Sequence, residues 1–193
     1  MRYDFLITVI KLLRPHSIVE IGVHKGLRAE SMCMEALKYQ SQVDYKGFDL
    51  WEQLSDHNLV SNGKGPSRKQ DVENRLDNIR KKYKGFNYEL VQGDTEYTVP
   101  VGLEADLAFI DGDHRDWAIQ RDYDRTQNSK VIVLDDVYEP LIPGLGANNL
   151  QVSKDCSVAI FESWDLVRAT ETRINLMIVA QDSLIDKLSL KHR

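Results

Sequence analysis

Short apolar runs alternate with amphipathic stretches along most of this 193-residue chain. Five runs are typical of β-strands: 17–21, 43–50, 87–94, 105–112 and 130–136. Helical patterns separate several of them, at 27–40, 67–83 and 116–126. Because strands that alternate with helices build parallel sheets covered on both faces, this order predicts a three-layer α/β fold whose first five strands are parallel.

The last quarter of the chain extends this pattern. After a connection rich in Gly, Pro and Asn at 140–150, the segment at 155–165 is predicted as a helix. The runs at 166–171 and 173–180 are predicted as a closing hairpin. The whole is a Rossmann-like α/β domain over 1–193, with a mostly parallel seven-stranded sheet and one antiparallel strand near its C-terminal edge.

Composition narrows the class of protein. The apolar fraction of 42% is enough for a real core, and the net charge of -5 argues against a nucleic-acid partner. The N-terminal apolar run at 5–13 is interrupted by Thr8 and Lys11, and no run approaches the roughly 20 apolar residues of a membrane span. We therefore expect a cytoplasmic protein with no membrane partner.

Acidic residues close each of the first five predicted strands: Glu20, Asp49, Asp94, Asp111 and the pair Asp135 and Asp136. One such residue is explained by turns and helix caps. Five strands that all end in acids, at the sheet edge where α/β proteins bind ligands, indicate a functional site.

The loop after the first strand carries two glycines, Gly22 and Gly26. They permit a tight turn and close approach of a ligand, but the third glycine of the G-x-G-x-x-G dinucleotide motif is missing. This departure favours a nucleoside ligand without phosphate. Asp49, at the end of the second strand, is placed to accept the hydroxyl hydrogens of a ribose.

The set "VEIGVHKG", "GFD", "QGDTEYT", "FIDGDHRDWAIQRDYD" and "VIVLDDV" resembles class I S-adenosylmethionine-dependent methyltransferases. It is similar in particular to the small-molecule O-methyltransferases, of the methyltransferase family 24 type, that carry an I-D-G-D-H signature. The resemblance covers roughly residues 15 to 137 and implies a cofactor site made by the residues Glu20, Gly22, Gly26, Asp49, Gly93, Asp94 and Asp111. In this family-like site, Glu20, Gly22 and Gly26 line the methionine part of S-adenosylmethionine. Asp49 binds its ribose, and Gly93 and Asp94 lie beside its adenine.

The carboxylates of Asp111, Asp135 and Asp136 end adjacent strands, so we expect them to converge on one pocket. Three carboxylates at close quarters repel unless a cation or protons intervene, and an oxygen-rich set suits Mg²⁺, with Mn²⁺ or Ca²⁺ as substitutes. The resemblance to metal-dependent catechol-type O-methyltransferases implies the same metal ligands. Those enzymes also place a basic residue three positions after the strand-four Asp, as His114 follows Asp111 here.

These residues predict methyl transfer to the hydroxyl of a small molecule, with His114 as general base beside Asp111. Some alternatives stay open. In one alternative, His114 orients Asp111 or caps the next helix. In the others, Asp113 caps that same helix, and Asp136 caps the connection after the fifth strand. Catechol-type enzymes often end the fifth strand in Asp-Asn, so Asp135-Asp136 brings one extra negative charge.

Acceptor contacts must come from the loops at 51–67 and 137–155, or from another subunit of a homo-oligomer. The first loop is long and polar and is a candidate cover for the pocket. Trp51 and Trp117 either wall the pocket or serve as core and cover residues. Two other functions remain as alternatives: a nicotinamide-dependent oxidoreductase, and a non-catalytic partner subunit that binds S-adenosylmethionine.

Overall fold

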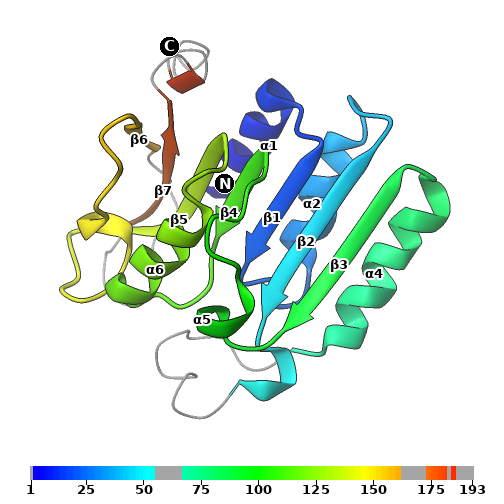
Figure 1. Ribbon diagram of the computed structural model, residues 1–193, viewed down its shortest axis with the longest axis horizontal. Helices are drawn as coiled ribbons and strands as arrows, with labels where there is room; N and C mark the ends of the chain where they lie inside the picture. The colour runs from blue at the N-terminus through cyan, green and yellow to red at the C-terminus, as the bar shows by residue number, and fades with distance from the viewer. Residues whose placement is uncertain (1, 55–66, 162–172, 182–183, 186–193) are drawn as a thin grey trace.

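The computed structural model describes residues 2–54, 67–161, 173–181 and 184–185. Within these ranges one sheet has the strand order β3-β2-β1-β4-β5-β7-β6 (Figure 1). Its strands are β1 (Ser17–Ile21), β2 (Val43–Asp49), β3 (Phe86–Gln92), β4 (Leu107–Ile110), β5 (Val131–Glu139), β6 (Ser157–Phe161) and β7 (Arg173–Ala180). The first five strands are parallel, and β7 runs antiparallel to both of its neighbours. The predicted Rossmann-like fold, with its single antiparallel strand near the edge, is confirmed.

Helices cover the two faces of the sheet and make two separate cores. The helices are α1 (Arg2–Leu13), α2 (Leu27–Ala36), α4 (Lys69–Lys82), α5 (Thr95–Thr98) and α6 (Asp116–Thr126), with 3₁₀ turns η1 (Trp51–Gln53) and η2 (Ala147–Asn149). Apolar residues of α1, α2 and α4 pack on one face, whereas those of α6 and η2 pack on the other (Figure 1). This arrangement buries β5 over Val131–Tyr138, as its apolar sequence predicts.

The helices predicted at 27–40, 67–83 and 116–126 are present as α2, α4 and α6. Val72, Leu76 and Ile79, which carry the helical spacing of α4, are all buried against the sheet. The predicted bounds of α6 agree with the structure, while α2 and α4 are a few residues shorter than predicted. The N-terminal α1 and the one-turn α5 have no counterpart among the predicted elements.

The helix predicted at 155–165 is wrong, because the structure has strand β6 there. Burial alternates along it: Val158 and Ile160 are exposed, whereas Ala159 and Phe161 pack against the core. This period of two suits a strand, and β6 pairs antiparallel with β7. The hairpin partner predicted at 166–171 lies outside the described residues, as does most of the loop predicted as a cover, at 55–66.

Helix α1 packs across the sheet towards this edge. Its Phe5 stacks on Phe161 of β6, with ring centroids 3.6 Å apart. Its first turn reaches the carboxyl end of β5, where Tyr3 contacts Asp135. No helix in the described ranges has both the length and the apolar character needed to cross a bilayer.

Candidate functional site

A pocket opens beyond the carboxyl ends of β1, β2 and β4, where the strand order reverses. The space within it, with open solvent at its mouth included, is about 820 Å³. Among the predicted site residues, those lining it are Gly22, Asp49, Asp94, Asp111 and His114. Residues distant in sequence thus meet at the edge where the parallel topology placed them.

Two glycines with positive φ follow β1, and Gly22 is the one that lines the pocket. Gly22 has φ +89°, and a methyl group added to it would lie 2.1 Å from the carbonyl oxygen of Asp111. Gly26 also has positive φ and begins α2, where an added methyl group would lie 2.9 Å from a Val72 side chain. Gly22 therefore allows the β1 and β4 ends to approach one another, while Gly26 allows α2 to pack on α4.

Asp49 is held rigidly at the end of β2. Its two carboxylate oxygens accept hydrogen bonds from the backbone N–H groups of His24 and Trp51, both at 2.7 Å. Each oxygen keeps a second lone pair, so the carboxylate can still accept two hydroxyl hydrogens from a ligand in the pocket. A carboxylate with these free lone pairs can bind a ligand that carries two neighbouring hydroxyl groups.

Gly93 and Asp94 follow β3, and of these two residues Asp94 alone lines the pocket. The N–H of Gly93 donates to the carbonyl oxygen of Asp49 at 2.9 Å, which joins the two strand ends. Asp94 caps α5 by accepting the N–H of Glu96 at 2.9 Å, and it also lines the pocket. Asp94 therefore has a structural role in addition to any contact with a ligand.

Glu20 lies beneath the pocket, fully buried between the sheet and α2. Burial raises its pKa to about 8, although the hydrogen bond that it accepts from Tyr45 at 2.5 Å opposes this rise and the nearby Asp111 adds to it. Its Oε1 atom has no hydrogen-bond partner among the described residues. Glu20 is therefore mostly a neutral acid at pH 7 in the free protein.

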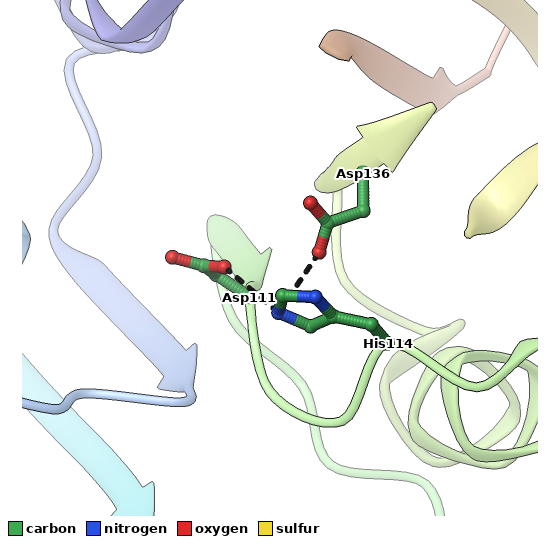
Figure 2. A group of neighbouring side chains, drawn as sticks. All are labelled: Asp111, His114 and Asp136. Carbon is green, nitrogen blue, oxygen red and sulfur yellow. Dashed lines mark ion pairs between the residues drawn. The ribbon is translucent and has the colours of Figure 1, made fainter. Parts of the chain in front are cut away.

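Three ligand-type side chains meet at the ends of β4 and β5 (Figure 2). The Nε2 atom of His114 lies 3.1 Å from Asp136 Oδ2 and 4.0 Å from Asp111 Oδ1. One donor atom from each of these three side chains lies within 4.8 Å of the others. On the other side of the imidazole, the hydroxyl of Tyr138 is 3.5 Å from Nδ1. The arrangement can hold a cation or move a proton.

The expected convergence of Asp111, Asp135 and Asp136 is wrong for Asp135. Its Oδ2 atom accepts a hydrogen bond of 2.8 Å from Tyr3 of α1, and it is not part of the group around His114. Asp135 and Asp136 are adjacent on β5 but meet different partners, because the strand is irregular between Leu134 and Val137. His114 takes the place that the prediction assigned to Asp135.

A local irregularity places Asp136 in this group. The pairing of β5 with β7 shifts register between Leu134 and Val137, so one extra residue is accommodated there. Asp136 has φ +64°, an uncommon conformation for a residue other than glycine. β-bulges of this kind redirect side chains, and backbone strain of this kind clusters at functional sites.

Asp113, Trp51 and Trp117 all line the pocket. Asp113 accepts hydrogen bonds from both the backbone and the side chain of Arg115 at the start of α6, so its carboxylate is engaged there. Trp51 is buried and donates to the carbonyl oxygen of His24, whereas Trp117 is 52% exposed, yet both line the pocket.

Sequence reasoning missed three residues of this region. Tyr138 follows Asp136 by two positions, a spacing that could have indicated it. Arg121 of α6 lines the pocket, and Tyr3 contacts Asp135 from a position 132 residues away in the chain. Nothing in the sequence indicates the last contact, because it depends on how α1 packs across the sheet.

Comparison with known proteins agrees with this fold. A family model described as a methyltransferase domain matches residues 19–137, which is more than half of the chain. The search of curated proteins finds no match to the chain.

Solved structures share the architecture at low sequence identity. The O-methyltransferase TomG from Streptomyces achromogenes, in complex with SAM, is 13% identical, with a TM-score of 0.53 over 92% of this chain and 78% of that one. An O-methyltransferase from Bacillus cereus in complex with SAH is 12% identical, with a TM-score of 0.54 over 92% and 80%. Spermidine synthase from Thermotoga maritima is 15% identical, with a TM-score of 0.55 over 98% and 62%. At such identities the likeness concerns the fold alone.

Proposed function

This chain belongs to the methyltransferase-domain family, and we propose that it transfers a methyl group from S-adenosylmethionine to the hydroxyl of a small molecule. The observation that carries the cofactor part is the Asp49 carboxylate, fixed by two backbone N–H groups at the pocket wall beside the Gly22 turn. The sequence lacks the third glycine of a dinucleotide loop, so a nicotinamide cofactor is the less favoured alternative.

The acceptor part rests on His114. When bound, S-adenosylmethionine supplies a methyl carbon made electrophilic by its sulfonium. With the acceptor hydroxyl against His114, the imidazole would take the hydroxyl proton as the methyl group passes from the sulfonium sulfur to the acceptor oxygen. Asp136 Oδ2, 3.1 Å from Nε2, would stabilise the imidazolium that forms. The proton then leaves to solvent through the open mouth of the pocket.

A divalent cation fits the same group of side chains. Asp111, His114 and Asp136 offer two carboxylates and one imidazole, a donor set that suits Mn²⁺ better than Mg²⁺, which prefers oxygen ligands alone. A cation held there would polarise the acceptor hydroxyl and lower its pKa. With Nε2 committed as a ligand, His114 would not act as the base, so metal binding by His114 and proton transfer to it are distinguishable roles.

The first test is a calorimetric titration with S-adenosylhomocysteine. Saturable binding by the wild-type protein, weakened at least tenfold in Asp49→Ala, is expected. No binding by a folded wild-type protein would overturn the proposed cofactor, and unchanged binding by the variant would remove Asp49 from the ribose site. Release of S-adenosylhomocysteine in the presence of a panel of hydroxylated small molecules then tests transfer, which His114→Gln should abolish. A protein that binds the cofactor without turnover on any acceptor would support the non-catalytic partner subunit instead.

The neighbouring acids of β5 provide a matched pair for the metal. Mn²⁺ binding, followed by electron paramagnetic resonance of the free ion, should be lost in Asp136→Asn and kept in Asp135→Asn, because only Asp136 belongs to the group around His114. His114→Gln should weaken Mn²⁺ binding if the imidazole is a ligand and leave it unchanged if His114 serves only as the base. Equal loss in both aspartate variants would contradict the assignment of Asp136.

A further inference from the structure

The one-turn helix α5 supplies part of the pocket wall, yet little of it is buried. Its N-cap Asp94 and first residue Thr95 line the pocket, and none of its four residues is buried. A helix of one turn has too few backbone hydrogen bonds to be stable alone. Contacts with a neighbouring element must therefore determine where this wall lies.

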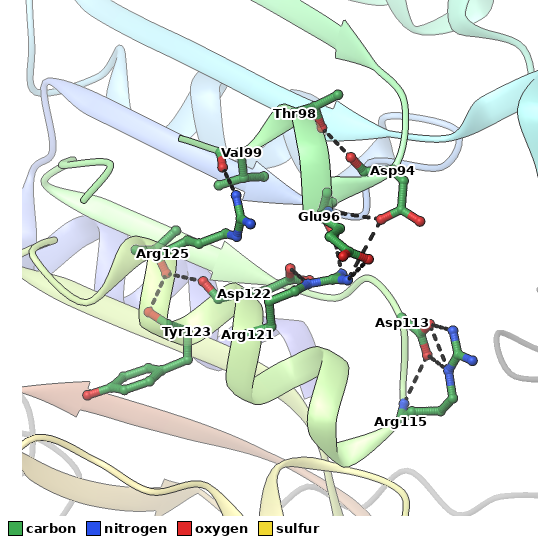
Figure 3. A network of polar contacts seen from close by, with 12 residues as sticks. Asp94, Glu96, Thr98, Val99, Asp113, Arg115, Arg121, Asp122, Tyr123 and Arg125 are labelled. Carbon is green, nitrogen blue, oxygen red and sulfur yellow. Dashed lines mark hydrogen bonds and ion pairs between the residues drawn. The ribbon is translucent and has the colours of Figure 1, made fainter. Parts of the chain in front are cut away.

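Those contacts come from Arg121 of α6, which Figure 3 shows beside Asp94 and Glu96. Its Nη2 atom donates to the Thr95 hydroxyl at 2.6 Å. Its Nη1 atom lies 3.8 Å from Asp94 Oδ1 and 3.6 Å from Glu96 Oε2. The planar guanidinium thus contacts three consecutive residues across the start of α5, a geometry that a single ammonium group cannot reproduce.

Arg121 is itself anchored from α6. Its Nε atom lies 3.2 Å from Oδ1 of Asp122, which is buried. Burial raises the pKa of Asp122 to about 6, while the charge of Arg121 and a hydrogen bond with Thr95 oppose the rise. Asp122 is therefore largely ionised at pH 7 and holds the guanidinium in place. Trp117 packs against the same guanidinium, 5.5 Å from ring centroid to Cζ.

A second arginine holds the other end of α5. Arg125, four residues after Arg121 and therefore on the same face of α6, donates to the backbone carbonyl of Val99 (Figure 3). Val99, the C-cap of α5, is buried in the core and is not among the residues that line the pocket. The two arginines thus hold opposite ends of the same turn, but only Arg121 acts at the pocket.

We propose that Arg121 is a positioning residue for the cofactor, which holds Asp94 and Thr95 in the orientation that binds its nucleoside end. The inference rests on the proposed function, because it assigns these residues to the S-adenosylmethionine site. Its physical basis is that the guanidinium restricts the side chains of Asp94, Thr95 and Glu96 before the ligand arrives, which lowers the entropy cost of binding.

The test is a double-mutant cycle read by calorimetric titration with S-adenosylhomocysteine. Arg121→Gln should weaken binding about tenfold, as expected for loss of charge-assisted contacts. Because Arg121 acts through Asp94, the two effects should not be independent. The fold-loss of affinity in the double variant Asp94→Asn/Arg121→Gln should be smaller than the product of the two single losses. Arg125→Gln should change binding less than about twofold, and its effect should be independent of Asp94→Asn.

Thermal unfolding of each variant separates positioning from a general loss of stability. If Arg121→Gln and Arg125→Gln weaken binding equally, the stability of α5 rather than the Arg121 contact sets the affinity, and the proposal is wrong. Unchanged binding in Arg121→Gln, or independent effects of Arg121 and Asp94, would also overturn it. Absence of binding by the wild-type protein is a different result, because it refutes the proposed function itself.

Discussion

Replacing Glu20 by Gln should change how the stability of this protein depends on pH. Glu20 is fully buried, and its pKa rises from an ordinary value of 4.5 to about 8. The folded protein therefore retains a proton that the unfolded chain releases at much lower pH. Glutamine keeps the shape of the side chain and an oxygen that can accept the Tyr45 hydroxyl, but it does not titrate.

The sign and size of the effect follow from linkage. An acid whose folded pKa is raised contributes stability that is fully present below its unfolded pKa and is lost as pH rises through its folded pKa. For Glu20 this window extends from 4.5 to about 8. At about 1.4 kcal/mol for each pH unit, the wild type should lose about 4 kcal/mol relative to Glu20→Gln between pH 5 and pH 8.

Urea unfolding of both proteins without cofactor, at pH 5, 6.5 and 8, measures this difference directly. Titration of other groups, such as Asp122, is common to both proteins and cancels. A stability difference that stays constant within about 0.5 kcal/mol across this range would refute the reasoning. Tyr45→Phe provides a directional check, since the Tyr45 hydrogen bond lowers the pKa of Glu20. In that background the difference should continue to grow above pH 8.

Three further substitutions test the framework of the site. Gly22→Ala should lower the free energy of unfolding by at least about 2 kcal/mol and abolish S-adenosylhomocysteine binding, because the methyl group would lie 2.1 Å from the Asp111 carbonyl oxygen; an unperturbed variant would contradict that close approach. Tyr3→Phe should cost about 2 kcal/mol in urea unfolding by removing the 2.8 Å hydrogen bond from Tyr3 to the buried Asp135 carboxylate, and no change would argue against the α1 contact. Trp51→Ala should cost about 3–5 kcal/mol by opening a cavity beside the pocket, and a smaller loss in calorimetric unfolding would indicate that the site collapses.

Much of the site was predictable because strand topology converts local patterns into long-range proximity. Once 17–21, 43–50 and 105–112 are recognised as parallel strands, their carboxyl ends must share one edge. Asp49, Asp111 and the glycine after β1 therefore meet without any knowledge of side-chain packing. The structure confirms the parallel sheet and brings these residues to one pocket.

Two predictions were wrong, the helix at 155–165 and the position of Asp135, and in both the local sequence pattern fits two structures. The segment 155–165 contains an apolar run that fits a helix or a strand, and only its pairing with β7 makes it β6. Asp135 and Asp136 were both expected in the pocket because the pair ends the fifth predicted strand. Which of the two faces His114 depends on the bulge in β5, which arises from its pairing with β7.

Sequence alone established the first five strands, the helices α2, α4 and α6, and the edge of the sheet at which the acidic residues gather. These depend on periodicity and chain direction, which are local properties of the polypeptide. Three contacts are visible only in the folded protein: Asp136 rather than Asp135 approaches His114, Tyr3 contacts Asp135, and Arg121 contacts α5. Such contacts join residues from separate elements, and their geometry depends on how those elements pack.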